Sequence, residues 1–102
     1  MFDDEAVAQI RAHGINQFGE KTLTAHALKL SEECGEVAGA VIRHSERRDG
    51  RGWLSELEHE VGDVLVTVAQ VCAASGISME QVARDSKERF LNRTWDIQHK
   101  PE

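Results

Sequence analysis

The sequence predicts an all-α fold in which four helices pack as an antiparallel bundle. Aromatic residues make up only 5% of the chain, tyrosine is absent and the single proline, Pro101, lies near the carboxyl end, a composition that favours helices over packed strands. Apolar residues recur every three or four positions, as they do in amphipathic helices. The length of 102 residues fits one domain, which we place at residues 1–102 with its motif-bearing part at about 23–95.

The first two predicted helices cover about residues 3–18 and 23–45. Gly14 and Gly19 weaken the first helix, because glycine lowers helix stability by about 1 kcal/mol, and a break within it is left open. Thr22 and Thr24 are alternative N-caps for the second helix. The residues that share one apolar stripe on the second helix are Leu30, Cys34, Val37, Ala38, Val41 and Ile42.

A polar segment separates the second and third predicted helices. Residues 46–52 contain two glycines and no apolar side chain, which predicts a solvated turn. The third helix follows at about residues 53–74 and ends at Ser75 and Gly76. Its second half is apolar on nearly every side, so it has to be covered on every side. Four short helices barely achieve that, and we therefore expect a homodimer or homotetramer. The apolar stripe of this helix comprises Leu54, Leu57, Val61, Val64, Leu65 and Val68.

The fourth predicted helix has the clearest start signal in the chain. Residues 78–81 read Ser-Met-Glu-Gln, which is a capping box. Ile77 and Val82 are placed to form the accompanying hydrophobic staple. The helix is expected to run to about Asn92.

The overall charge excludes several classes of protein. The chain has 18 acidic and 12 basic residues, a net charge of -6, which argues against binding a nucleic-acid polymer through a basic face. No run of about 18 apolar residues is present and the first residues are acidic, so we expect neither a membrane span nor a signal peptide. Cys34 and Cys72 lie among apolar residues and are interpreted as reduced, buried thiols. These features predict a cytoplasmic protein.

Four acidic residues form a symmetric pattern about the predicted turn. Glu33 and Glu36 share one face of the second helix, and Glu60 and Asp63 share one face of the third, because residues three apart are helix neighbours. If the turn is centred near Arg48, Glu36 and Glu60 are equally distant from it, as are Glu33 and Asp63. Equal distances give equal heights in an antiparallel helix pair, so the four carboxylates are expected to converge.

Converging carboxylates call for a cation. They repel one another and do not all stay ionised without one. Mg²⁺ suits an all-oxygen site with open positions for water and phosphate, and Mn²⁺ is an alternative. Gly35 and Gly62, within the two acidic segments, are interpreted as small residues that let helix backbones or a ligand approach. Spacing alone leaves ordinary solvated helix faces as the competing interpretation.

The third helix also carries parts of two other metal-binding patterns. Glu56 and His59 form one Glu-x-x-His motif, whereas di-iron four-helix bundles need two. The helical wheel places His59 away from the apolar stripe, so it is predicted to be a poor inward ligand. His59 and Glu60 also begin like H-E-x-x-H, but Asp63 stands where the second histidine is needed, which excludes the zincin pattern.

The acidic motifs carry a family resemblance. Glu32-Glu33-x-x-Glu36 followed by Glu60-x-x-Asp63 resembles the E-E-x-x-E … E-x-x-D signature of the MazG-like nucleotide pyrophosphohydrolases, in the all-α NTP pyrophosphatase superfamily. The flanking residues are also similar. This resemblance implies hydrolysis of a (d)NTP to the (d)NMP and pyrophosphate, as part of nucleotide-pool house-cleaning.

The resemblance also implies roles for individual residues. The implied Mg²⁺ ligands are Glu33, Glu36, Glu60 and Asp63. Catalytic roles fall to Glu32 and Glu33, with Glu32 acting either as a support for the ligands or as a base that orients water. Phosphate contacts are expected from the basic segment of the fourth helix and, more weakly, from the second helix. These candidates are Lys87, Asn92, Arg93 and Lys29.

Alternatives remain for both the basic residues and the function. Cations near a helix carboxyl end also favour the helix dipole without binding phosphate. Within the superfamily, the chain resembles phosphoribosyl-ATP pyrophosphohydrolases and dUTP- or dCTP-specific enzymes less closely. The alternative outside the enzymes is a helical interaction module without catalytic activity.

Overall fold

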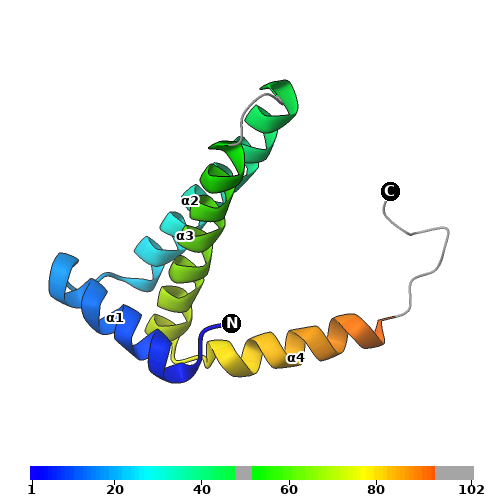
Figure 1. Cartoon of the computed structure of the whole chain (residues 1–102). Coiled ribbons are helices and arrows are strands. Elements are labelled where there is room, and N and C mark those ends of the chain that lie inside the picture. The colour runs from blue at the N-terminus through cyan, green and yellow to red at the C-terminus, as the bar shows by residue number, and fades with distance from the viewer. Residues whose placement is uncertain (48–51, 94–102) are drawn as a thin grey trace.

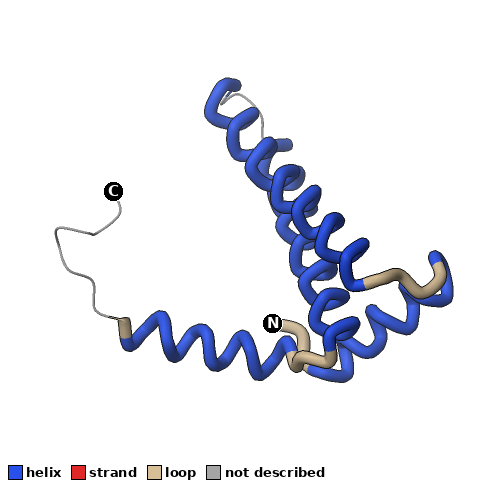
Figure 2. The backbone as a smooth tube through the Cα atoms, turned by 180° about the vertical axis from the view of Figure 1, so that it is seen from behind, coloured by secondary structure: helices blue, strands red, loops and turns tan. Residues whose placement is uncertain are grey.

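The computed structural model describes residues 1–47 and 52–93, and the described part contains helices and no strand, which confirms the all-α prediction. The predicted turn centre, Arg48, lies outside the described residues. α2 and α3 run side by side as an antiparallel pair, α1 packs across one end of α3, and α4 extends away from that end (Figures 1 and 2). The four helices are α1 (Asp4–Phe18), α2 (Leu23–Arg47), α3 (Gly52–Ser75) and α4 (Met79–Asn92).

Short polar side chains set the starts of α2 and α4. Thr22 Oγ1 accepts a hydrogen bond from the Ala25 backbone N–H at 3.1 Å, which identifies Thr22 as the cap between the two alternatives. Ser78 Oγ accepts from the Gln81 backbone N–H at 3.2 Å, so this half of the predicted capping box is confirmed. The Gln81 side chain donates to Asp85, one turn further along α4.

α3 ends in a Schellman motif. Gly76 has φ +75°, Ile77 donates its backbone N–H to the Cys72 carbonyl at 2.9 Å, and Gly76 donates to the Ala73 carbonyl at 3.4 Å. This arrangement satisfies two carbonyls that the helix end leaves without partners. Ile77 and Val82 remain about half exposed, so the predicted staple between them does not shield either side chain from water.

Two glycine substitutions, one within α3 and one just after its end, are expected to change stability in opposite directions. Gly76→Ala forces a Cβ into the left-handed region, where L-residues cost about 1–2 kcal/mol, and should lower the free energy of unfolding by about that amount. Gly62→Ala places its Cβ in open space within a helix and should raise it by up to about 1 kcal/mol. Urea unfolding without metal measures both. An equal loss in the two variants would contradict this assignment.

The surroundings of Gly35 and Gly62 do not support their interpretation as residues that let the two helix backbones approach. A Cβ added at Gly35 or at Gly62 would meet no atom within 4 Å outside its own helix backbone. Neither glycine is therefore required for α2 and α3 to approach each other within one chain.

The core is small and lies where α1, the second half of α3 and the start of α4 meet. Val7, Ala69, Cys72 and Met79 are buried there, and no large side chain in the described residues is fully buried. Cys72 is buried as predicted. The prediction for Cys34 is wrong, because this thiol is exposed on a face of α2 that no other helix of the chain covers.

α2 and α3 each present a second apolar face to solvent. The α2 face that packs within the chain holds Leu30, Glu33, Val37 and Ala40, which are buried or half-buried. Most of the predicted α2 stripe lies outside this contact, whereas four of the six residues of the predicted α3 stripe are half-buried. The exposed apolar side chains of the pair include Leu28, Val41, Ile42, Leu54 and Val61.

None of the described helices is on its own long and apolar enough to cross a membrane. α3 and α4 meet the length and composition criteria only when taken together, and they are bent by 110° relative to each other.

Candidate metal centre

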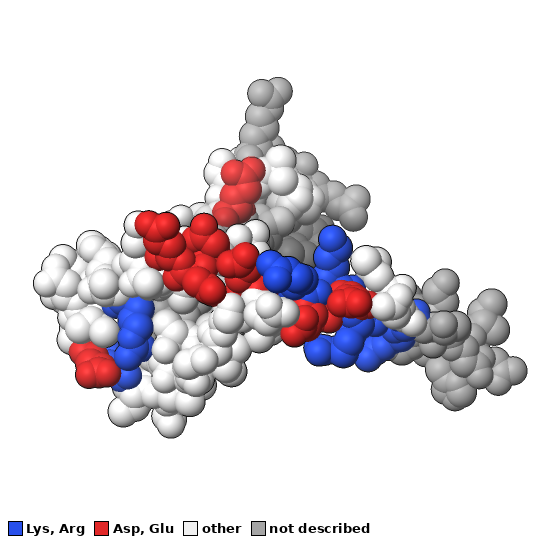
Figure 3. Space-filling model, turned by 90° about the horizontal axis from the view of Figure 1, so that it is seen from below, with Lys and Arg blue, Asp and Glu red and all other residues white. Residues whose placement is uncertain are grey.

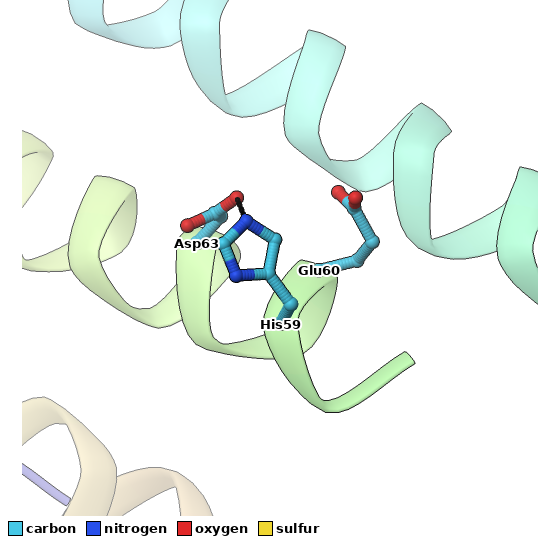
Figure 4. Close-up of side chains that lie close together, drawn as sticks. All are labelled: His59, Glu60 and Asp63. Carbon is cyan, nitrogen blue, oxygen red and sulfur yellow. Dashed lines mark ion pairs between the residues drawn. The ribbon is translucent and has the colours of Figure 1, made fainter. Parts of the chain in front are cut away.

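Three side chains with metal-binding atoms gather on one face of α3. Glu60 and Asp63 lie one turn apart, and the ligand atoms of His59, Glu60 and Asp63 all lie within 4.8 Å of one another. The His59 Nε2 is 3.4 Å from the Asp63 carboxylate, and the Glu60 carboxylate points toward α2 (Figure 4). Behind them, Thr67 Oγ1 donates to the Asp63 backbone carbonyl at 2.8 Å. The result is a compact nitrogen and oxygen donor set at the edge of the helix pair.

Glu33 is the acidic residue most deeply placed on α2. It lies on the face that packs against α3 and is only 8% exposed. Lys29 Nζ lies 3.1 Å from the Glu33 carboxylate and 3.5 Å from that of Glu32. The hydrogen bond that Lys29 donates to Glu33, and then the charge of Glu32, raise the pKa of Lys29. An ammonium group therefore lies beside this buried carboxylate.

The four predicted metal ligands are only partly brought together. Glu60 and Asp63 belong to the cluster on α3. Glu33 is buried between the helices, and Glu36 is exposed on α2. Among the described residues, the cluster whose ligand atoms all lie within 4.8 Å of one another includes neither Glu33 nor Glu36. Their convergence on a common cation stays a prediction.

The register of the helix pair is close to the one used to predict that convergence. Arg43 and Glu56 form an ion pair between α2 and α3, and the rings of His44 and Trp53 stack with centroids 3.5 Å apart. His44 and Trp53 lie four and five residues from Arg48 and are nearly equidistant from it, whereas Arg43 and Glu56 lie five and eight residues from it. The two contacts therefore centre slightly after Arg48.

The predicted phosphate contacts of α4 lie on another arm of the molecule. α4 contacts α1 and α3 but not α2, and its axis is bent by 110° from that of α3. Asp63 lies roughly 18 Å along α3 from the bend and Lys87 roughly 12 Å along α4, at 1.5 Å per residue. Basic side chains gather along α4 (Figure 3). One chain therefore does not place Lys87, Asn92 or Arg93 beside the acidic cluster, whereas Lys29 lies beside Glu33.

A cavity of about 540 Å³ opens between α1, the start of α2 and the middle of α3. Its apolar lining includes Ile15, Phe18 and Leu28, and its side toward the acidic residues includes Lys29 and Glu32. The volume falls within the range of small-molecule sites. The cavity thus adjoins the segment that carries Glu33.

Gln70 reaches this cavity because of a glycine on α1. α1 continues unbroken through Gly14, and a Cβ at that position would lie 3.1 Å from Gln70 Oε1. The glycine that weakens α1 in isolation therefore makes room for a polar side chain of α3. α1 ends at Gly19, whose φ of 78° is of the kind that glycine adopts readily.

The donor set is suited to a divalent cation. Glu60 and Asp63 bring like charges close together, and a cation between them would remove their repulsion. Carboxylate oxygens with open positions suit Mg²⁺ or Mn²⁺. The residues present therefore fit the metal implied by the sequence, and the cluster lies partly exposed, where phosphate oxygens can reach it.

Two elements of this site were not predicted from the sequence. His59 is exposed, as the helical wheel suggested, yet its imidazole still reaches Asp63. The spacing of four residues was a signal for that pairing, since such residues are neighbours on a helix. Gln70 had no such signal, because it meets the cavity only through the packing of α1 on α3.

Comparison with protein-family models matches residues 21–97 to the MazG nucleotide pyrophosphohydrolase domain. No curated protein and no solved structure matches the chain. The matched segment contains the acidic residues of both motifs, which are Glu32, Glu33, Glu36, Glu60 and Asp63.

Proposed function

The chain belongs to the MazG nucleotide pyrophosphohydrolase family, and from this premise we propose that it hydrolyses a (d)NTP to the (d)NMP and pyrophosphate with Mg²⁺. The observation that carries the proposal is the pair of carboxylates on α3, Glu60 and Asp63, whose ligand atoms lie within 4.8 Å of each other. Glu33, buried on the facing side of α2, supports it. We further propose a role in clearing unwanted nucleotides from the cytoplasmic pool.

Each acidic residue has a distinct role in this proposal. Glu33, Glu36, Glu60 and Asp63 would hold the cation, which when bound offsets phosphate charge and makes water a better nucleophile. Glu32 lies beside Glu33, pairs with Lys29 and is well exposed, so water can reach its carboxylate, which would accept a proton. Lys29, which lies between these two carboxylates, would donate hydrogen bonds to phosphate oxygens.

The reaction follows from these positions. Water adds to one phosphorus of the α–β anhydride, and the bond from phosphorus to the bridging oxygen breaks. Glu32 takes the proton released by water. The bridging oxygen keeps the electron pair of the broken bond on the phosphate that is not attacked, and the products are the nucleoside monophosphate and pyrophosphate.

The cavity beside Lys29 is the proposed nucleoside site. Its apolar walls, including Phe18, would cover the base, and the Gln70 amide can both donate and accept hydrogen bonds at a base edge. Glu32 and Lys29 line its other side. A nucleoside held there would direct its phosphates toward Glu33.

Truncating Gln70 tests this placement. Gln70→Ala is expected to raise KM roughly tenfold while changing kcat less, because it removes binding shared by substrate and transition state. Gln17→Ala, at an exposed α1 position outside the cavity lining, serves as the control. Steady-state kinetics on the preferred nucleotide measure both. Equal KM values for Gln70→Ala and wild type would show that the base binds elsewhere.

We also propose that the protein acts as a homodimer or higher homo-oligomer. The uncovered apolar faces of α2 and α3 and the exposed Phe90 and Leu91 of α4 are surfaces that a second copy can cover. Apolar faces of this kind are what permanent homodimer interfaces bury.

In such a dimer the partner's α4 would supply the phosphate contacts. Lys87, Asn92 and Arg93 lie on an arm directed away from the acidic cluster of α3 in their own chain, whereas Lys29 is the basic side chain beside Glu33. Contact between basic groups of α4 and the acidic cluster of a second copy would favour pairing between copies. This arrangement would complete each site with cations from its neighbour.

A product assay tests the proposed function. The purified protein is incubated with Mg²⁺ and a panel of canonical and modified (d)NTPs, including dUTP, dCTP and phosphoribosyl-ATP, and pyrophosphate and orthophosphate are measured separately. We expect pyrophosphate from one or more nucleotides. No release from any of them, together with no thermal shift on adding Mg²⁺, would favour the non-catalytic interaction module.

A further inference from the structure

His59 places an imidazole nitrogen against the acidic residues of α3. Its Nε2 lies 3.4 Å from Asp63 Oδ2. Two ligands at adjacent corners of an octahedron, each about 2.1 Å from the metal, are about 3 Å apart. The observed separation is thus close to that of two atoms bound to one ion.

The third donor, Glu60, lies close to the other two. Its ligand atoms are within 4.8 Å of those of His59 and Asp63, whereas opposite corners of the same octahedron are about 4.2 Å apart, so a small side-chain adjustment brings all three to one ion. All three residues lie within one turn and a quarter of a single helix. The helix backbone therefore holds them close together without help from a loop.

The placement of His59 leaves its nitrogen accessible. Its side chain is 74% exposed and that of Asp63 is 44% exposed, so an ion can reach both from solvent. An exposed pair at this spacing contributes little to stability, which gives no strong structural reason for a histidine here. A ligand role uses the ring as a nitrogen donor.

We propose that His59 is a ligand of the metal centre and makes it a mixed nitrogen and oxygen site that favours a first-row transition ion over Mg²⁺. This proposal rests on the metal site of the proposed function and adds a nitrogen donor to its carboxylates. Imidazole binds Mn²⁺ and the later divalent ions better than it binds Mg²⁺, and affinity rises from Mn²⁺ to Co²⁺. Mg²⁺ prefers oxygen ligands and retains its waters.

Pulsed electron paramagnetic resonance of bound Mn²⁺ tests the proposal directly. A ligated imidazole couples its ¹⁴N nucleus to the electron spin, so the full-length protein with one equivalent of Mn²⁺ should show ¹⁴N modulation. His59→Gln should lose that modulation while still binding Mn²⁺. His13→Gln, an exposed histidine on α1, is the matched control and should keep it.

Calorimetry gives an independent measurement. His59→Gln is expected to weaken Co²⁺ binding by about tenfold or more, the effect typical of altering groups at a metal site, and to change Mg²⁺ binding less than about threefold. Bound Mn²⁺ without ¹⁴N modulation, together with pyrophosphate release, would overturn the role of His59 and leave the proposed function intact. No binding of Mn²⁺, Co²⁺ or Mg²⁺ at all would overturn both.

Discussion

Glu60→Gln is expected to lower kcat/KM by at least about a hundredfold, the scale found when one charge-stabilising group is removed from a catalytic site. Glutamine keeps the size of the side chain but removes the charge that faces the cation. Asp63→Asn should have a similar effect for the same reason. Pyrophosphate release under saturating Mg²⁺ measures both variants, and circular dichroism should show that they remain helical.

Glu58→Gln is the matched control for this experiment. Glu58 lies on the same helix, is exposed and is not part of the ligand group on α3, so the substitution changes net charge equally without touching the site. Its activity should stay within about twofold of wild type, as expected for a surface change away from such features. Wild-type activity in Glu60→Gln and Asp63→Asn together would show that the metal centre is assigned to the wrong residues.

Thermal shifts separate a binding defect from a folding defect. Magnesium should raise the melting temperature of the wild-type protein, because a ligand that binds only the folded state stabilises it. The shift should shrink or vanish in Glu60→Gln. Without metal, this variant should melt at or slightly above the wild-type temperature, since it removes one of two like charges at close range.

The second large effect concerns the contribution of the partner chain. Lys87→Ala is expected to lower activity by about a hundredfold through loss of a phosphate contact. A mixed dimer of one Glu60→Gln chain and one Lys87→Ala chain should regain about half of wild-type activity, because a two-fold symmetric interface leaves one of its two sites with both residues intact. Co-expression with two affinity tags isolates the mixed dimer for assay.

A different mixed dimer provides the control. Glu60→Gln combined with Asp63→Asn damages residues of the same arm, so each of its two sites lacks one carboxylate and no activity should return. If the dimer of Glu60→Gln and Lys87→Ala were as inactive as this control, Lys87 would not act on the site of its partner. Full activity of Lys87→Ala alone would instead remove Lys87 from the phosphate contacts.

The helix boundaries were predictable because the signals that set them are local. Thr22 and Ser78 accept hydrogen bonds from residues three positions ahead, and Gly76 adopts the left-handed conformation that ends α3. Such interactions depend on neighbours in the chain and not on distant packing. The pairing of α2 with α3 followed for a related reason, since only four residues, 48–51, connect these two long amphipathic helices.

Which apolar face becomes buried was less predictable. α2 is apolar on two sides, and the sequence pattern merged them into one stripe that included Cys34, Val41 and Ile42. α3 covers only the side that holds Leu30, Val37 and the charged Glu33. The periodicity of apolar residues does not show whether a helix face is covered by the same chain or by a second copy.

The sequence by itself determined the helices, their ends, the register of the α2–α3 pair and the identity of the acidic residues, because caps, period and spacing are properties of short segments. Within single helices, the spacing of four residues already pairs Lys29 with Glu33 and His59 with Asp63. Only the tertiary structure decided that Glu33 is buried against α3 and that Gln70 enters a cavity beside Gly14. It also decided that α4 leaves α3 at a steep angle and carries Lys87 away from the acids. These features depend on how whole helices meet in space, and neither helical period nor residue spacing specifies that direction.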